Sequence, residues 1–492
     1  MVQRGQHDER ERYARGAEVL AAPVEARPAA AAAASPSPTA GSTLAPRARR
    51  GRRGRRRRAG RGRRTLVAVA LAITTVTGTA GWAVAHEQPA VTGPPPGASA
   101  WRADDSLGRP LPDPATASPT AVARFFAGLT TAEQHTLAQR HPLITGNLDG
   151  APITLRYAAN ARALAVERDR ELARARDGGL TSQGRDRARD RAERYAALLA
   201  GDRQILAFDP RDRGQVAEVY GDLTRARRAA VIVPGSDIDL GSYATPTAPA
   251  TPPRAATTTA DRADAGPGDG ASAPPADAEA AATPIGMATS LRSELARQAP
   301  HTGTAVISWT GYSTPVGLGL DAATGRLARA GAPRLDRFLA GLAVADGAPA
   351  APPTVLCHSY GSVVCGLAAH RIGPDASDLV VLGSPGTRAD SVADLGTGAR
   401  VWAAKDGSDW IGKIPHVELF GLGHGADPAS GGFGARRLST ARVDGHAGYF
   451  APNTESVRNF ARITLGDFDA VRCAVDSDST AAEVRGCVSD LL

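Results

Sequence analysis

The chain has 492 residues, enough for two or three domains, and its formal net charge is +8. Twelve arginines and no acidic residue lie in residues 47–64, whereas residues 1–46 carry five arginines and five acidic residues. Residues 65–492 are therefore mildly acidic, so the basic total does not support nucleic acid as the partner of the folded part.

Two stretches hold too few large apolar side chains to form a core. They are residues 1–64, rich in Arg, Ala, Pro and Ser, and residues 244–283, rich in Ala, Thr, Pro and Asp. Neither can bury enough surface to offset the entropy of ordering it. We expect a disordered, Arg-rich cytoplasmic leader and a disordered insert within a folded domain.

Residues 65–85, TLVAVALAITTVTGTAGWAVA, contain no charged side chain. About 20 apolar residues span a bilayer as a helix, and arginines directly before such a segment predict an N-terminus inside and the following chain outside. The segment also fits a signal sequence, cleaved after Ala85. The sequence thus predicts an extracytoplasmic protein, either held by a single-pass anchor or secreted, and no nucleic acid partner.

Residues 86–117 are rich in Pro, Gly and Ala and predict a linker. Residues 118–202 predict a helical region with two short helices, a turn-rich loop at 144–152, and long charged helices at 156–176 and 184–202. We expect this region to cover the active end of the following domain as a cap.

From residue 203 to 470, short β-branched runs alternate with helices, and residues 471–492 form a C-terminal tail. The alternation predicts an α/β fold: a mainly parallel sheet with helices on both faces and its first strands antiparallel at one edge. The expected strands are 204–208, 216–221, 229–235, 303–309, 353–359, 378–386, 399–405 and 437–443. The expected helices include 287–298, 332–344 and 361–372.

The stretch VLCHSYGSVVCG (355–366) nearly matches G-x-S-x-G, with Cys357 where the first glycine would stand. A serine nucleophile on a tight strand-to-helix turn needs small residues two positions before and after it, and Cys357 and Gly361 supply them. Because strand, turn and helix occur in this order around Ser359, we favour a nucleophile over a serine that merely caps the helix.

The chain order Ser…Asp/Glu…His then predicts where the acid and the base lie. The loop after the seventh expected strand offers Asp406 and Asp409, of which we prefer Asp409, and the loop after the last strand offers His446. His446 would take the proton of Ser359 while the aspartate holds its tautomer. His424 is the alternative base.

An oxyanion hole needs two backbone N–H groups aimed at the developing charge. Tyr360, directly after the serine, would supply one, and Gly235 or Ser236, in the loop after the third expected strand, would supply the other. Asp237 lies close enough in sequence to orient this loop.

Four cysteines fit an exported protein. A disulfide between Cys473 and Cys487 would close a short loop and stabilise the fold by roughly 3 kcal/mol. Cys357 and Cys365 flank the serine, and the sequence leaves their pairing open. No C-x-x-C occurs, and we predict neither a metal nor a cofactor.

These segments together resemble a branch of the α/β-hydrolase superfamily that is catalogued as a domain of unknown function and is common in high-GC Gram-positive bacteria. The matching segments are ITGNLDGAPITLRYAAN, QILAFDP, VIVPGSD, ISWTGY, VLCHSYGSVVCG, VVLGSPG, GLGHGADP and GHAGYF. The resemblance implies an α/β-hydrolase fold with Ser359, Asp409 and His446 as the triad, and it implies no particular substrate.

The leading hypothesis is an exported serine hydrolase that cleaves an ester, thioester or amide bond of a small-molecule or lipid-like acyl substrate. A non-catalytic binding protein on the same fold and an acyltransferase using the same three residues are the alternatives.

Overall fold

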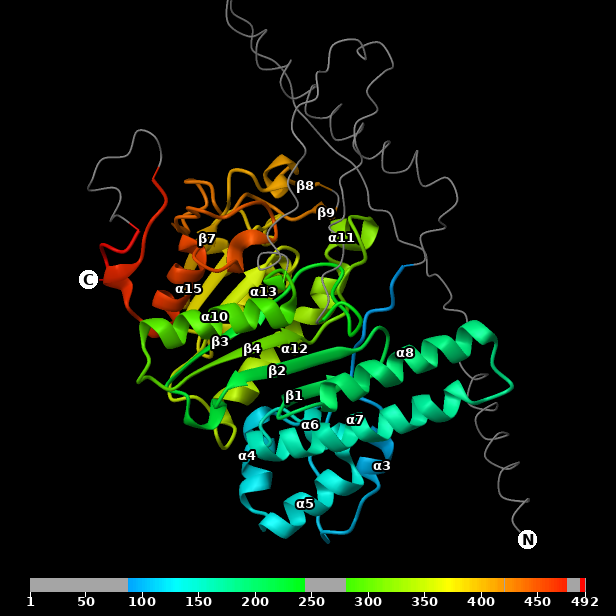
Figure 1. Ribbon diagram of the computed structural model, residues 1–492. Coiled ribbons are helices and arrows are strands. Elements are labelled where there is room, and N and C mark those ends of the chain that lie inside the picture. Colours follow the sequence, from blue (N-terminus) through cyan, green and yellow to red (C-terminus); the bar gives the residue numbers. More distant parts are fainter. Residues whose placement is uncertain (1–86, 244–279, 420, 476–486, 492) are drawn as a thin grey trace, which may run out of the picture. The chain divides into compact units, whose positions relative to one another are not determined.

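The computed structural model describes residues 87–243, 280–419, 421–475 and 487–491 (Figure 1). The predicted leader, the predicted membrane segment 65–85 and most of the predicted insert lie outside these residues, so these predictions stay predictions. No helix within the described ranges is long and apolar enough to cross a bilayer.

One eight-stranded sheet forms the centre of the described chain, in the order β1-β2-β4-β3-β5-β6-β7-β10. Its strands are β1 (Gln204–Asp209), β2 (Gln215–Gly221), β3 (Arg228–Val233), β4 (Thr304–Thr310), β5 (Thr354–His358), β6 (Asp378–Leu382), β7 (Arg400–Ala404) and β10 (Arg436–Arg437). Strand β2 runs antiparallel to both of its neighbours and all other pairs are parallel. The predicted mainly parallel sheet with an antiparallel edge is confirmed.

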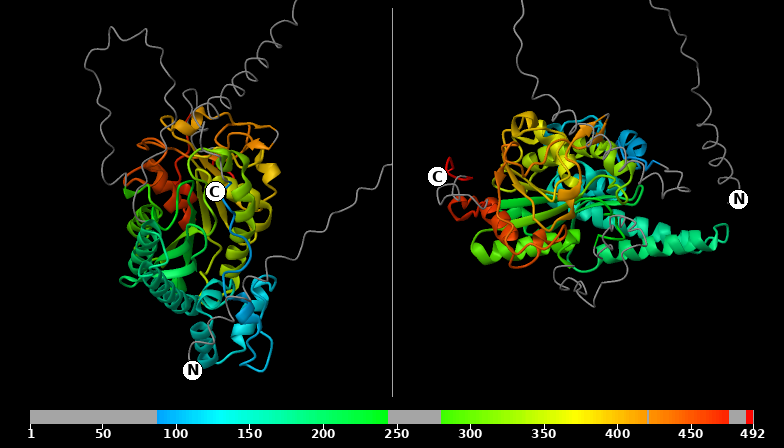
Figure 2. Two further views of the ribbon diagram at one scale, coloured as in Figure 1. Left: turned by 90° about the vertical axis from the view of Figure 1, so that its right-hand side faces the viewer. Right: turned by 90° about the horizontal axis from the view of Figure 1, so that it is seen from above.

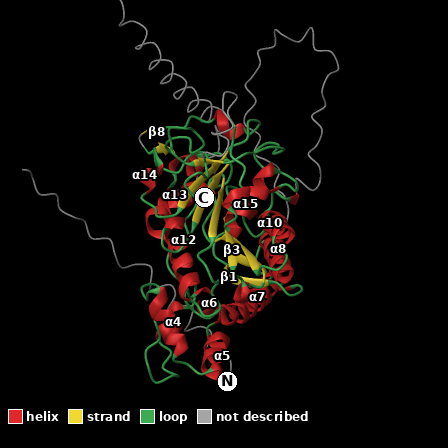
Figure 3. Ribbon diagram, turned by 90° about the vertical axis from the view of Figure 1, so that its left-hand side faces the viewer, coloured by secondary structure: helices red, strands yellow, loops and turns green. Residues whose placement is uncertain are grey.

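Helices cover both faces of the sheet (Figure 3). Alternate residues of a strand point to opposite faces: Val231 and Val355 join the core under α12 (Arg326–Val344) and α13 (Gly361–Ile372), whereas Ile232 and Leu356 join the core under α10 (Pro284–Gln298) and α15 (Glu455–Leu465). Burial on both faces explains why these strands read as continuous apolar runs.

The N-terminal helices pack against one edge of the sheet. They are α3 (Ala98–Arg102), α4 (Pro119–Ala127), α5 (Thr131–Arg140), α6 (Pro142–Asn147), α7 (Ile153–Ala175) and α8 (Ser182–Leu199). Helices α6 and α7 contact β1, and α4 and α5 lie at the end of the sheet opposite the loops around residues 405–430 (Figures 1 and 2). The expectation that this region caps the active end of the sheet is therefore wrong.

Hydrogen bonds from polar side chains of α6 and α7 hold these two helices against β1. An edge strand leaves a row of backbone groups without a strand partner. Arg156 donates to the carbonyl of Leu206, Asn160 donates to that of Ile205, and the Asn147 amide both donates to and accepts from the backbone of Phe208. The helical region thus supplies the hydrogen bonds that a ninth strand would make.

Three further local expectations differ from the structure. The segment expected as a linker packs against the body, with Trp101 of α3 fully buried and its indole N–H donating to the Pro112 carbonyl. The expected loop 144–152 begins inside α6. Of the last expected strand, 437–443, only Arg437 pairs with β7, as part of β10 (Arg436–Arg437), and Leu438 forms a bridge with Cys473.

Short elements complete the described chain. They are α11 (Leu320–Thr324), α14 (Val392–Leu395), the hairpin β8 (Glu418–Leu419) with β9 (Leu422–Gly423), and the 3-10 turns Leu223–Arg225, Trp410–Lys413, Gly448–Phe450 and Phe468–Ala470.

Candidate active site

Ser359 sits on a sharp turn between β5 and α13. Its φ is +54°, in the left-handed region, which costs a residue with a side chain about 1–3 kcal/mol unless the surroundings hold it there. Two glycines permit the turn: a Cβ on Gly361 would lie 2.3 Å from the Val233 carbonyl oxygen, and one on Gly235 would lie 2.6 Å from the Ser359 Cβ. The serine is left partly exposed at the carboxyl ends of the strands.

A disulfide holds the two sides of this turn together. Cys357, the next-to-last residue of β5, bonds to Cys365 in the second turn of α13, with the Cα atoms 6.5 Å apart. Both cysteines are fully buried. The cysteine that departs from G-x-S-x-G is thus half of a covalent bridge between the strand and the helix that flank Ser359. Cys473 and Cys487 form the second disulfide.

The structure brings Ser359, His446 and Asp409 together. His446 Nε2 lies 2.8 Å from Ser359 Oγ, and His446 Nδ1 lies 2.9 Å and 3.1 Å from the two carboxylate oxygens of Asp409. The Asp409 side chain is fully buried, and that of His446 is 17% exposed. A proton on Nδ1, donated to the aspartate, leaves Nε2 free to accept the serine hydroxyl proton.

Asp409 is held as a carboxylate by several donors. Besides His446, the backbone N–H of Ile411 donates to Oδ1 and the Tyr449 hydroxyl donates to Oδ2 at 2.7 Å. Burial raises the pKa of Asp409, but the hydrogen bonds and the charge of His446 outweigh it, so the pKa lies below its usual range. The carboxylate is therefore available to orient the imidazole at neutral pH.

The alternate acid Asp406 does not contact His446. Its carboxylate accepts from the backbone N–H and the hydroxyl of Ser408, and the Ser408 Oγ accepts from the backbone N–H of Gly445. Asp406 therefore shapes the loop that carries Asp409 and joins it to the loop that carries His446.

The alternate base His424 also lies apart from the serine hydroxyl. Its Nε2 donates to the Ala322 carbonyl at 2.7 Å, and its ring meets the edge of the Tyr360 ring at a centroid distance of 5.8 Å. Burial lowers the pKa of His424 to about 4. It is a neutral histidine that joins the loop after β7 to α11.

Three aromatic groups support the site, of which the sequence predicts only His358, as a residue that packs beside the nucleophile. His358 donates from Nε2 to the backbone carbonyl of His446, and its ring lies 4.8 Å from the His446 ring. The Trp410 ring lies 4.7 Å from the same His446 ring, and the Tyr449 hydroxyl donates to Asp409. His358 and Trp410 directly adjoin Ser359 and Asp409 in sequence, whereas Tyr449 lies 40 positions from the Asp409 carboxylate that it contacts.

The loop that carries the expected oxyanion donors lies beside the serine turn, because a Cβ on Gly235 would lie 2.6 Å from the Ser359 Cβ. Among the described residues, the backbone N–H groups of Tyr360, Gly235 and Ser236 have no hydrogen-bond partner. Tyr312, fully buried after β4, donates its hydroxyl to the Pro234 carbonyl at 2.7 Å. Asp237 accepts from the backbone N–H of Gly317 at 2.7 Å, so both ends of the loop are fixed.

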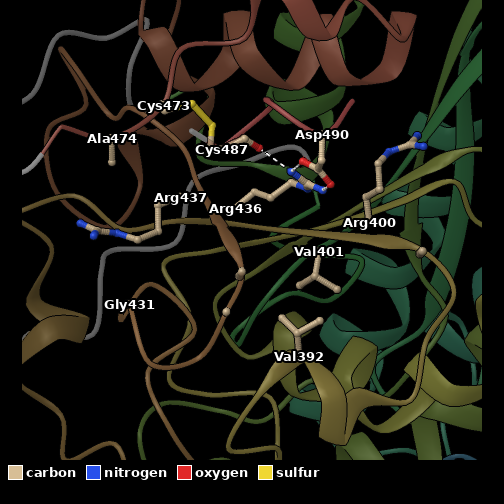
Figure 4. A pocket seen from close by; sticks show the side chains of 13 residues that line it. Val392, Arg400, Val401, Gly431, Arg436, Arg437, Cys473, Ala474, Cys487 and Asp490 are labelled. Atoms are coloured by element: carbon tan, nitrogen blue, oxygen red, sulfur yellow. Dashed lines mark hydrogen bonds and ion pairs between the residues drawn. A yellow bond between two sulfur atoms is a disulfide. The ribbon is translucent and has the colours of Figure 1, made fainter. Parts of the chain in front are cut away.

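A cavity of about 640 Å³ lies elsewhere in the fold (Figure 4). It is bordered by the start of β7, by β10 and by the Cys473–Cys487 disulfide, and the Arg436–Asp490 ion pair lies across it. None of the residues around Ser359 lines it. Among the described residues, no group of His, Cys, Asp and Glu side chains could hold a metal ion.

Comparison with known proteins agrees with this architecture. A family model described as alpha/beta hydrolase matches residues 209–273 and 256–419. The uncharacterized protein Rv2079 of Mycobacterium tuberculosis is 30% identical over 432 residues, which cover 76% of this chain and 59% of that protein. The uncharacterized protein Mb0988c of Mycobacterium bovis is 41% identical over 92 residues, which cover 19% of this chain and 34% of that protein.

The chain thus spans 59% of the length of its Mycobacterium tuberculosis relative. The family match lies on the strands and loops that build the sheet, and the matched relatives carry no assigned activity. The chain thus resembles the alpha/beta-hydrolase family over residues 209–419, and the relatives that it matches are uncharacterized proteins.

Proposed function

We propose that the protein is a serine hydrolase that cleaves an ester, thioester or amide through an acyl-enzyme intermediate. The observation that carries the proposal is the 2.8 Å approach of His446 Nε2 to Ser359 Oγ, with the buried Asp409 on the opposite ring nitrogen. A nucleophile, a base and a group that orients the base are the three parts that this chemistry requires.

In the first half-reaction, Ser359 Oγ attacks the acyl carbon while its proton passes to His446 Nε2. The resulting imidazolium is stabilised by the Asp409 carboxylate. The backbone N–H groups of Tyr360 and of Gly235 or Ser236 receive the negative charge that develops on the carbonyl oxygen. His446 then protonates the leaving group, and the acyl group stays on the serine.

In the second half-reaction, a water molecule enters where the leaving group departed. His446 Nε2 takes a proton from this water, whose oxygen attacks the acyl carbon, and the proton then returns to Ser359 Oγ as the acid leaves. The turn must stay rigid through both steps, which the Cys357–Cys365 disulfide favours.

The same proposal includes an extracytoplasmic location and an acyl substrate of small-molecule or lipid type. The uncharged segment 65–85 after the arginine run supports export, and two disulfides support an oxidising compartment. The apolar residues around the site, described below, favour a lipid-like substrate.

A fluorophosphonate probe tests the proposal directly. We expect the probe to label the purified protein and to lose labelling in Ser359→Ala. The matched control is Ser182→Ala, an exposed serine on α8, which should label at the wild-type rate. Labelling that persists in Ser359→Ala would refute the nucleophile, and absence of labelling in the folded wild type would favour a binding protein on this fold.

A further inference from the structure

Large apolar side chains gather on two neighbouring surface segments. Among the described residues, eight large hydrophobic residues are exposed. Five of them lie on two segments, residues 316–320 and 417–419, with exposed fractions of 41–57%. The five, which we call the apolar rim, are Val316, Leu318, Leu320, Val417 and Leu419. The other three, Val166, Val344 and Val475, lie on separate elements. Such a concentration marks an interaction surface, whereas scattered apolar residues do not.

Arg388 joins the two segments of the apolar rim. Its Nη2 donates to the carbonyls of Thr324, at the end of α11, and of Gly421, between β8 and β9, and its Nη1 pairs with Glu418. Helix α11 contacts β9 directly, and Figure 1 shows α11 beside the β8–β9 hairpin. The two segments that carry the apolar rim therefore adjoin each other.

The apolar rim borders the proposed catalytic site. The Tyr360 hydroxyl, on the residue that follows the serine, donates to the Asp321 carbonyl of α11 at 3.4 Å. The His424 ring donates to the next carbonyl, that of Ala322. On the other side, the oxyanion loop is tied to the rim through Asp237 and Gly317. The rim segments are therefore hydrogen-bonded to the residue after Ser359 and to the loop of the expected oxyanion donors.

The start of the described chain is fastened to the same surface. The Gln88 backbone N–H donates to the Asp321 carboxylate at 2.9 Å, and its side-chain amide donates to the Thr314 carbonyl and accepts from the Val316 N–H. The guanidinium of Arg326 donates to the Gln88 carbonyl. Gln88 is thus fixed within the rim on several sides.

The predicted membrane segment ends at residue 85, three residues before Gln88. Three residues reach about 10 Å when fully extended. If residues 65–85 span a bilayer, Gln88 lies within this distance of the membrane surface, and the rim segment to which Gln88 is bonded lies close to that surface. Apolar side chains in this position can enter the headgroup and upper acyl-chain region.

We infer that the apolar rim lies in the surface of a lipid bilayer and that the protein draws a membrane lipid with an acyl ester from that bilayer to Ser359. The inference rests on the proposed hydrolase function and names its substrate class. The short tether from residue 85 to Gln88 keeps the active-site face turned to the membrane, so the lipid need not cross water to reach the serine.

Depth-dependent quenching tests the placement of the rim. The full chain is reconstituted in phosphatidylcholine–phosphatidylglycerol vesicles with a fluorophore on Leu320→Cys, and all four native cysteines are paired. Lipids brominated in the acyl chains should quench this fluorophore several-fold more than one on Val166→Cys, a similarly exposed apolar residue on α7. Equal, weak quenching at both positions would overturn the inference.

Two further outcomes would also overturn it. A Leu320 fluorophore shielded from aqueous iodide but not quenched by brominated lipid would mean that a protein covers the rim. Release of the chain from the vesicles by alkaline washing would mean that residues 65–85 do not anchor it. In either case fluorophosphonate labelling of Ser359 could persist, so failure of the inference is distinguishable from failure of the hydrolase function.

A kinetic test addresses substrate delivery. The combined change Val316→Ser, Leu318→Ser and Leu320→Ser should lower about tenfold the ratio of turnover of a vesicle-embedded diacyl lipid to turnover of a soluble short-chain ester. Val166→Ser should leave this ratio at the wild-type value. An unchanged ratio in the triple variant would contradict delivery through the rim.

Discussion

His358 donates a hydrogen bond from its buried imidazole to the backbone carbonyl of His446, 2.8 Å away. The residue directly before the proposed nucleophile therefore holds the loop that carries the proposed base. His358 also packs its ring against that of His446 and lies close to Tyr449. Strand β5 thus positions both the serine and, through its last residue, the histidine.

Replacing His358 by phenylalanine should loosen the His446 loop while keeping most of the ring volume. The carbonyl of His446 loses its donor, at a cost of about 1–3 kcal/mol in stability, and we expect the rate of fluorophosphonate labelling to fall at least tenfold in protein that remains folded. Leu291→Ala, which truncates a fully buried side chain of α10, is the control for a loss of stability alone. Equal labelling rates in the two variants would contradict a positioning role.

The pH dependence of stability should change in the same variant. Burial and the neighbouring His446 lower the pKa of His358 to about 3, whereas an unfolded histidine titrates at about 6.5. As the pH falls below about 6.5, the unfolded chain binds a proton that the folded protein does not, so stability is lost until the pH falls below about 3.

His358→Phe removes this proton uptake. Below pH 6.5 the stability of the variant should therefore fall less steeply than that of the wild type, by up to about 1.4 kcal/mol per pH unit. Urea unfolding at pH 7, 6 and 5 measures the difference. Parallel stability curves for the two proteins would mean that the folded protein binds the proton at His358 as readily as the unfolded chain does.

Asp409→Asn and Asp406→Asn form a matched pair. The first change replaces a carboxylate that accepts from His446 Nδ1 with an amide that favours the wrong tautomer, and we expect turnover of a nitrophenyl ester to fall by about 10³–10⁴. The second change touches only the Ser408 contacts, and turnover should fall less than tenfold. The reverse order would assign the acid to Asp406.

Gly235→Ala should disrupt the serine turn from the loop after β3, the strand that pairs with β5. The added Cβ would lie 2.6 Å from the Ser359 Cβ, so either the serine or the oxyanion loop must move, and a shift of about 1 Å can cost a hundredfold in rate. Gly412→Ala is the control, because a Cβ there meets nothing within 4 Å. Labelling of both variants at the wild-type rate would show that the turn tolerates the displacement.

The disulfide beside the serine should contribute to stability. Replacing Cys357 and Cys365 together by alanine opens a loop with a sequence separation of 8, which the chain-entropy model values at roughly 2.5 kcal/mol. Differential scanning calorimetry should show a lower Tm than for the wild type. A Tm equal to that of the wild type would mean that packing alone holds the strand and the helix together.

The main strands could be predicted because sheet residues buried on both faces leave continuous apolar runs, as in β5 and β6. The short pairing of β10 could not, because residues 437–443 alternate like a strand, yet Arg437 is the one residue among them that pairs with β7. The position of the N-terminal helices depends on Arg156 and Asn160 reaching β1, a contact that helical periodicity does not reveal.

The residues proposed for the chemistry could be chosen from order and spacing, since a strand, a serine turn, an acid loop and a histidine loop follow one another along the chain. The choice between Asp406 and Asp409 needed coordinates, because both occupy the same loop. Tyr312 and Tyr449 were not singled out, because each acts through a partner 40 or more positions away in sequence. Long-range polar contacts of this kind leave no local pattern.

The central claim is that Ser359 carries the acyl group. Rapid mixing with a nitrophenyl ester, followed by acid quenching and peptide mass spectrometry, tests it most directly. We predict a burst of nitrophenol close to one equivalent per protein and an acyl adduct on the peptide that contains Ser359. Steady ester turnover without an adduct on this peptide, or an adduct on another residue, would contradict the account.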